Sequence, residues 1–259
     1  MASRAEQKQQ ARERRLALEA SAAQAAARRR NLTLLGAVLA AAVVIVGVAV
    51  LVSRNNGPTS TGGTDTQKST QVAQLFSGVP EHGTVLGNPS AKFTLIEFAD
   101  LQCPVCQRYT LEVLPSVIQR YVRTGKIKMD FKLRTFIGPD SVKAARVAAA
   151  AAQQSRIWQF ADLFYHQQGE ENSGYVTADF LKRIANGTPG LNASKALAQA
   201  NSAASAKLID SDESLANTLG SNSTPNFYIR RGGGPLEPVS PSDLTPAAMA
   251  SALDKAIGS

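Results

Sequence analysis

Cysteine and histidine are scarce in this chain of 259 residues, which contains two of each. Two cysteines exclude a small domain held together by several disulfides, and they exclude a zinc site with four cysteine ligands. Two histidines supply few ligands for any other metal centre, so we expect no metal and no other cofactor. Charged residues make up 19% of the chain and hydrophobic residues 44%, a balance that excludes a wholly disordered protein.

Basic residues are unevenly distributed, although the formal net charge is +8. Residues 1–31 contain eight Lys and Arg against three acidic residues, so this tail carries +5 and the remaining chain only +3. A fold that binds nucleic acid through a basic surface is therefore not expected, because the excess positive charge lies in one short tail.

An apolar run, Leu32–Val52, contains 21 residues without a charge or a proline. At about 1.5 Å per residue, a helix of this length spans the hydrocarbon core of a bilayer, which is roughly 30 Å thick. Arg28–Arg30 precede the run, so the positive-inside rule places residues 1–31 in the cytoplasm and the chain after the run outside it. A cleaved signal peptide is the alternative, but its apolar region is normally about 7–15 residues long. We therefore predict an uncleaved, single-pass membrane anchor over residues 32–52.

The segment after the apolar run is poor in hydrophobic residues. Residues 53–78, and above all the Gly-, Ser- and Thr-rich part up to Thr70, are interpreted as a flexible linker. The remaining residues, 79–259, have the length of one ordinary domain.

A β-α-β unit is predicted at the start of this domain. Phe93–Phe98 is apolar on both faces and is interpreted as a central strand, with Glu97 among apolar residues of one face. Ile127–Leu133 alternates between apolar and charged residues, which is typical of a half-buried strand. Between them, Pro104–Val122 has apolar residues at helical spacing, and Pro115 is expected to interrupt that helix.

Helical patterns dominate the following 80 or so residues, and strand patterns return near the C-terminus. Residues 139–219 are predicted to be mostly helical, including one helix from Asn192 to about residue 209. Asn226–Ile229 and Leu236–Val239 are predicted to form a hairpin, and Pro246–Ile257 a last helix. The order of elements predicts an α/β sheet with an inserted helical subdomain over about residues 139–219.

The chemistry lies in Cys103-Pro104-Val105-Cys106, which contains both cysteines and follows the central strand at the start of a helix. Backbone N–H groups and the helix dipole stabilise a thiolate at Cys103 and make it a nucleophile at neutral pH. Cys106 lies one helical turn later, close enough to resolve a mixed disulfide. Pro104 fits the first helical turn, where no N–H is needed.

Two other interpretations of the cysteine pair are open. A structural disulfide that closes so short a loop would contribute little stability. A metal site would need His82 or His166, and neither is near the cysteines in sequence. The position between a strand and a helix favours redox chemistry over both.

Two segments carry a family resemblance: Glu97 to Cys106, and Ser223-Thr224-Pro225 before a strand. Together with the helical block, they resemble the thioredoxin-fold disulfide oxidoreductases of the DsbA type over about residues 80–258. The resemblance implies that Cys103 is an exposed nucleophile and Cys106 a buried resolving thiol. It also implies a cis peptide bond at Thr224-Pro225 that faces the cysteines.

The same resemblance assigns further roles. It implies that the backbone beside Thr224 and Pro225, together with Pro104 and Val105, contacts the substrate. It places a buried acid at Glu97, which would exchange protons with the second sulfur, since burial among apolar residues raises a carboxyl pKa. An exposed Glu97 is the alternative.

The implied function is extracytoplasmic exchange of a Cys103–Cys106 disulfide with thiols of exported proteins, with an unidentified redox partner in the membrane. The dipeptide between the cysteines is Pro-Val and not the Pro-His of the strongest oxidases, so one group that stabilises a thiolate is missing. A membrane-tethered reductase, for example for haem-attachment thiols, is therefore an alternative. A non-enzymatic copper-binding or adaptor module is another.

Overall fold

A six-stranded mixed sheet organises residues 62–258, the part of the chain that the computed structural model describes. The strand order is β1-β2-β4-β3-β5-β6. The strands are β1 (Glu81–His82), β2 (Val85–Leu86), β3 (Phe93–Asp100), β4 (Ile127–Arg134), β5 (Asn226–Arg231) and β6 (Glu237–Val239). β3 pairs parallel with β4 and antiparallel with β5, so the C-terminal end of β3 and the N-terminal end of β5 lie at one edge of the sheet.

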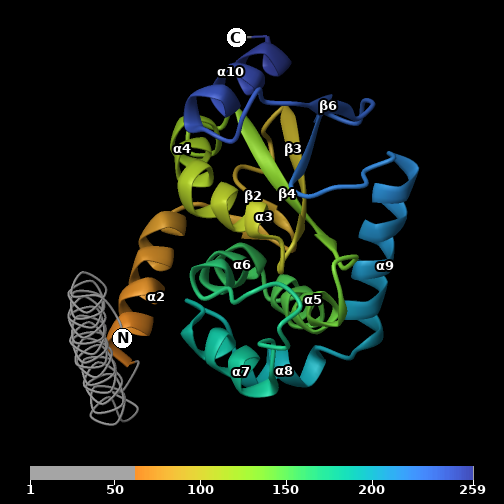
Figure 1. Ribbon diagram of the computed structural model, residues 1–259. Coiled ribbons are helices and arrows are strands. Elements are labelled where there is room, and N and C mark those ends of the chain that lie inside the picture. Colours follow the sequence, from red (N-terminus) through yellow and green to blue (C-terminus); the bar gives the residue numbers. More distant parts are fainter. Residues whose placement is uncertain (1–61, 259) are drawn as a thin grey trace, which may run out of the picture. The chain divides into compact units, whose positions relative to one another are not determined.

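Strand β3 is central, as its sequence predicts, because both of its faces are covered. Leu95 and Ala99 belong to the main core on the side of the helices that follow β3. Ile96 and Phe98 point to the other face and pack with Ala216 of α9 (Ala203–Thr218). In Figure 1, α3, α4 and α10 lie on one side of the sheet and α9 on the other.

The helical connection between β3 and β4 is interrupted, as Pro115 predicts. It consists of α3 (Pro104–Arg108), the π-helical turn η1 (Tyr109–Val113), α4 (Leu114–Val117) and the π-helical turn η2 (Ile118–Val122). The last helix, α10 (Pro246–Ile257), begins with the Thr245 side chain accepting a hydrogen bond from the Ala248 N–H.

A block of helices lies between β4 and β5, where the sequence predicts mostly helical structure. The block comprises α5 (Pro139–Ala152), α6 (Ile157–His166), α7 (Ala178–Gly187), α8 (Ala193–Gln199) and α9. The single helix predicted from Asn192 to about residue 209 is wrong, because the chain breaks after α8 and Ser202 caps α9 with a hydrogen bond from the Ser205 N–H.

The flexible linker predicted over residues 53–78 is wrong for most of its length. Residues Gly62–Phe76 form helix α2, with Val72 fully buried and Phe76 almost so. These apolar side chains join the main core, where α2 packs against α6 (Figure 1), and their burial stabilises a segment whose composition alone is polar.

The other predictions for the N-terminal region, the basic tail 1–31 and the membrane helix 32–52, lie outside the described residues. Within residues 62–258, no helix combines the length and apolar character that crossing a membrane requires.

The alternating sequence of β4 predicts a half-buried strand, and this prediction is wrong. Both faces of β4 are covered. Lys132 lies 3.2 Å from both Asp130 and Asp212, and Asp212 also accepts the Leu133 N–H at 3.0 Å. Arg134 donates to Glu213 at 2.9 Å. Asp212 and Glu213 belong to α9, so paired charges hold this helix over a face that the sequence marks as polar.

Candidate active site

Cys103 ends the loop after β3 and forms the N-cap of α3. Its Sγ accepts a hydrogen bond from the Cys106 N–H at 3.4 Å and donates one to the Thr224 carbonyl at 3.3 Å. The pKa of the Cys103 thiol is lowered from 9.0 to about 6, chiefly by its hydrogen bond with the Cys106 thiol. Burial opposes this effect, while the Thr224 side chain and the N–H groups of Cys106 and Val105 reinforce it.

Cys106 behaves in the opposite way. It is fully buried, and burial followed by the hydrogen bond and charge of Cys103 raises its pKa well above the ordinary value of 9.0. Both cysteines are free thiols. Near neutral pH, therefore, Cys103 is mostly a thiolate, which has lost the proton that the thiol form donates to the Thr224 carbonyl, and Cys106 is a protonated thiol.

Cys103 is less accessible than the resemblance implies, and the prediction of an exposed nucleophile is wrong for this state. Only 6% of the residue is exposed, because Thr224 and the first turn of α3 cover the sulfur. Its neighbours Pro104 and Val105 are exposed, Val105 to 39%. A reacting thiol therefore reaches Cys103 past these two side chains.

The Thr224-Pro225 peptide bond is cis, as predicted. Both residues are half-buried, and β5 begins directly after them at Asn226. The antiparallel pairing of β5 with β3 brings this bond to the sheet edge that carries Cys103. The structure thus brings Cys103 and Cys106 together with Thr224 and Pro225. The hydrogen bond between Cys103 and Thr224 joins residues that are 121 positions apart in the sequence.

Glu97 is fully buried in β3, which confirms the buried position and excludes the exposed one. In the sheet it lies between two aromatic residues, Phe131 of β4 and Phe227 of β5. Neither carboxylate oxygen has a hydrogen-bond partner among residues 62–258, and burial raises the pKa of Glu97 from 4.5 to about 8. The carboxyl group is therefore mostly protonated at neutral pH and can exchange a proton close to it.

Two tyrosines that sequence reasoning missed lie in the same region. Tyr109 of η1 is fully buried, and its ring lies 4.7 Å from that of Phe227. Tyr165 of α6 donates its hydroxyl to the Asp100 carbonyl at 3.0 Å. The charge of Glu97 raises the pKa of both tyrosines further, after burial. Tyr109 follows Cys106 by three residues, a helical spacing that places both on one face and that would have identified it.

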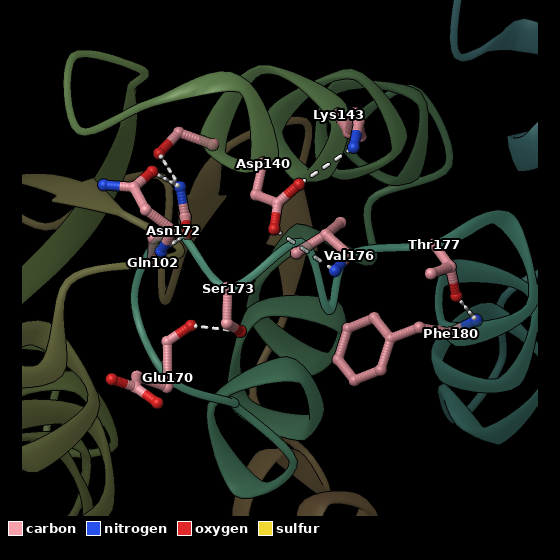
Figure 2. Close-up of polar contacts among 10 residues, drawn as sticks. Gln102, Asp140, Lys143, Glu170, Asn172, Ser173, Val176, Thr177 and Phe180 are labelled. Atoms are coloured by element: carbon pink, nitrogen blue, oxygen red, sulfur yellow. Dashed lines mark hydrogen bonds and ion pairs between the residues drawn. The ribbon is translucent and has the colours of Figure 1, made fainter.

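The loop between α6 and α7 is hydrogen-bonded to residues 101–103, which lead into the cysteine pair. Sequence reasoning did not predict this contact. Gln168 Nε2 donates to the carbonyl oxygens of Leu101 at 2.7 Å and Cys103 at 3.2 Å. Asn172 N donates to Gln102 Oε1 at 2.8 Å, and Figure 2 shows these two side chains turned toward one another. The partners are about 70 residues apart, and no local pattern marks them.

Further contacts fix this loop on α5. Asp140 accepts the Val176 N–H and pairs with Lys143 at 2.9 Å (Figure 2). A Cβ at Gly138 would collide with the amide oxygen of Asn172, so any larger residue there would displace this side chain from its present position.

Within residues 62–258, no group of three or more His, Cys, Asp or Glu side chains is arranged to hold a metal ion. His166 lies 3.4 Å from Asp162, on the helix that carries it.

The family of the chain follows from comparison with known proteins. Residues 80–247 match a family model described as thioredoxin, and the chain belongs to this family. It is 33% identical over 101 residues to a probable disulfide bond formation protein D of Bacillus cereus, a match that covers 38% of this chain and 47% of the relative. The chain therefore spans about half the length of that relative. Over 170 residues it is 25% identical to disulfide bond formation protein D of Bacillus subtilis, covering 62% of this chain and 75% of the relative.

A solved structure supports the same fold. The crystal structure of oxidised BdbD from Bacillus subtilis superimposes with a TM-score of 0.59 at 19% identity, covering 68% of this chain and 94% of that one. The predicted thioredoxin-like α/β fold is thereby confirmed.

Proposed function

We propose that the protein is a thiol–disulfide oxidoreductase that exchanges a Cys103–Cys106 disulfide with thiols of exported proteins. The observation that carries this proposal is the difference between the two sulfurs, since the pKa of Cys103 is lowered to about 6 while that of Cys106 is raised. One stabilised thiolate beside one buried thiol is the arrangement that disulfide exchange requires. The names of the Bacillus relatives, disulfide bond formation proteins, support the same activity.

The reaction oxidises a client dithiol in two displacement steps. A client thiolate attacks Cys103 Sγ, a mixed disulfide forms, and the Cys103–Cys106 bond breaks with Cys106 leaving as a thiolate. A second client thiolate then attacks the client sulfur of the mixed disulfide and releases Cys103 as a thiolate. Two electrons pass from the client to the protein, and the low pKa of Cys103 makes it a good leaving group.

Glu97 supplies the proton that the leaving Cys106 needs. A thiolate at Cys106 is costly because the residue is fully buried, and burial keeps the Glu97 carboxyl protonated up to a pKa of about 8. In the reverse direction the Glu97 carboxylate takes the proton back before Cys106 attacks.

The substrate lies across the exposed residues at the sheet edge. Pro104 and Val105 flank Cys103, and the backbone at Thr224 and Pro225 approaches it from the other side. Phe136, in the loop after β4, is another large hydrophobic side chain on this edge and is 48% exposed. An apolar, partly unfolded chain that carries a thiol fits these groups better than a small polar thiol does.

The stabilised thiolate favours oxidation of clients over their reduction. At pH about 7, a pKa of about 6 stabilises the reduced protein by about 1.4 kcal/mol, which raises the potential by about 30 mV relative to an ordinary thiol. The missing imidazole between the cysteines is therefore offset by hydrogen bonds from the first turn of α3.

The location follows from the N-terminal sequence. The apolar run Leu32–Val52 anchors the protein, with residues 1–31 in the cytoplasm and the catalytic domain outside, in the compartment where disulfides persist. A redox partner in the membrane reoxidises the cysteine pair after each cycle.

A trapping experiment on the full-length chain tests this function. The oxidised protein is mixed with a reduced, unfolded client, and disulfides in the client are counted by mass spectrometry. We expect oxidation by the native protein and none by Cys103→Ser. Reduced Cys106→Ser is mixed instead with a client that contains a disulfide: Cys103 attacks this bond, one client sulfur leaves as a thiolate, and the mixed disulfide through Cys103 accumulates because no Cys106 thiol is present to resolve it. Oxidation by Cys103→Ser at the native rate, or no mixed disulfide in Cys106→Ser, would overturn the proposal.

A further inference from the structure

Tyr109 and Glu97 are two buried residues whose polar side-chain atoms have no hydrogen-bond partner in the part of the chain that the structure describes. The Tyr109 hydroxyl and both Glu97 carboxylate oxygens make no hydrogen bond to residues 62–258, although both residues are fully buried. An unpaired buried polar atom costs about 1–3 kcal/mol, so a fold seldom keeps two such groups in one place without a use for them.

The sheet register and a ring contact place these two residues next to the same residue, Phe227. Phe227 is the residue of β5 directly opposite Glu97 of β3, and the Tyr109 ring packs on the Phe227 ring at 4.7 Å. Phe227 is therefore a neighbour of both residues: it is the sheet partner of Glu97, and its ring packs on the ring of Tyr109 from η1. The effect of the Glu97 charge on the Tyr109 hydroxyl agrees with this geometry.

The other groups around Glu97 do not supply a donor. Its partner on the β4 side is Phe131, which is apolar. The Glu97 charge affects the pKa of Tyr165 of α6, but the Tyr165 hydroxyl already donates a hydrogen bond to the Asp100 carbonyl. The Cys106 thiol is the group that exchanges its proton with Glu97, so it is not a separate donor. Of the two tyrosines whose pKa the Glu97 charge raises, Tyr109 is the one whose hydroxyl has no hydrogen-bond partner among residues 62–258.

We propose that Tyr109 is a positioning residue whose hydroxyl donates a hydrogen bond to the Glu97 carboxylate, directly or through one buried water, whenever Glu97 has given up its proton. This inference rests on the proposed function, since it concerns the reverse of its first step, in which Cys106 loses its proton and resolves a mixed disulfide. The Cys106 proton moves to Glu97, the Cys106 sulfur attacks Cys103, and the client leaves as a thiolate. Tyr109 keeps its own proton throughout and stabilises the charged carboxylate before the transfer.

Tyr109→Phe in the full-length protein removes only the hydroxyl. Loss of a donor to a charged group is expected to raise the pKa of Glu97 and to lower the fraction of carboxylate at neutral pH about tenfold or more. Resolution of a preformed mixed disulfide then slows by the same factor at neutral pH. It recovers at high pH, where Glu97 is ionised in both proteins. A purely structural defect would slow the reaction equally at every pH.

Tyr121→Phe is the matched control. Like Tyr109, Tyr121 is a buried residue of the helical connection between β3 and β4. Its hydroxyl, however, donates to the Ala250 carbonyl and to Asp254 of α10. This variant is expected to keep the native pH midpoint. Difluorotyrosine at position 109, a stronger donor, is expected to shift the midpoint in the direction opposite to Phe.

A direct titration separates this inference from the proposed function. Infrared difference spectra of protein with ¹³C-labelled glutamate, assigned with Glu97→Gln, report the ionisation of Glu97 without any client. An unchanged Glu97 titration in Tyr109→Phe, in a protein that exchanges disulfides normally, would overturn the role of Tyr109 alone. Absence of any mixed disulfide in the native protein would instead overturn the proposed function.

Discussion

Glu97 gives the native protein a stability that falls as the pH rises, and Glu97→Gln is expected to remove this dependence. The pKa of Glu97 is about 8 in the folded protein, against 4.5 for an ordinary glutamate. Below pH about 4.5 both folded and unfolded chains hold the proton, and the group has no effect. Between pH 4.5 and 8 only the unfolded chain releases it, so the unfolded state is favoured progressively.

The magnitude follows from the same two values. At pH about 7, the unfolded chain is favoured by about 3 kcal/mol relative to acidic pH, since each pKa unit corresponds to about 1.4 kcal/mol. At pH about 5 the corresponding loss is below about 1 kcal/mol. Burial of Glu97 in an apolar sheet therefore destabilises the fold at working pH, as is common for groups retained for function.

Urea unfolding of the reduced protein at a series of pH values measures this effect. Glutamine has the same size and no proton to lose, so the difference in unfolding free energy between variant and native protein should grow by about 2–3 kcal/mol from pH 5 to 7. Any constant cost of burying the amide shifts the whole curve and does not enter this difference. Two parallel pH curves would refute a raised pKa at Glu97.

Three further changes probe the rest of the site. Cys106→Ala removes the main hydrogen bond to Cys103, which is worth about 1.5–3 kcal/mol to a charged sulfur, so the thiolate fraction at neutral pH should fall from about nine tenths to one half or less. Iodoacetamide labelling measures this, and Cys106→Ser, which keeps a hydroxyl donor, should recover part of the rate. Gln168→Ala should lower the unfolding free energy by about 1 kcal/mol and slow disulfide exchange, whereas equal stability and rate would deny it a supporting role. Phe136→Ser should raise the KM for an unfolded client without changing the reaction with a small thiol, and equal effects on both would count against a client-binding surface.

The reactive residues of this site could be predicted from sequence because their signals are local. Cys103 and Cys106 lie within four consecutive residues, so their motif can be recognised without any knowledge of the fold. The run Phe93–Phe98 is apolar enough to predict a central strand. The cis bond at Pro225 was accessible only through family resemblance, because X-Pro bonds are about 5–6% cis without it.

The elements that sequence reasoning missed depend on distant partners. Helix α2 has a polar composition, and only its packing against α6 makes Val72 and Phe76 core residues. The charged face of β4 is predicted to be exposed to solvent when the strand is considered alone. In the structure it is covered, because Lys132 pairs with Asp212, about 80 residues later in the sequence. The low exposure of Cys103 likewise depends on Thr224, 121 residues away.

Ultraviolet absorbance of the thiolate in the reduced full-length protein tests the central claim most directly. The account predicts one thiolate that appears with a midpoint near pH 6, assigned to Cys103 by its loss in Cys103→Ser, while Cys106 ionises only well above pH 9. Two thiolates that both appear near pH 9 would contradict it.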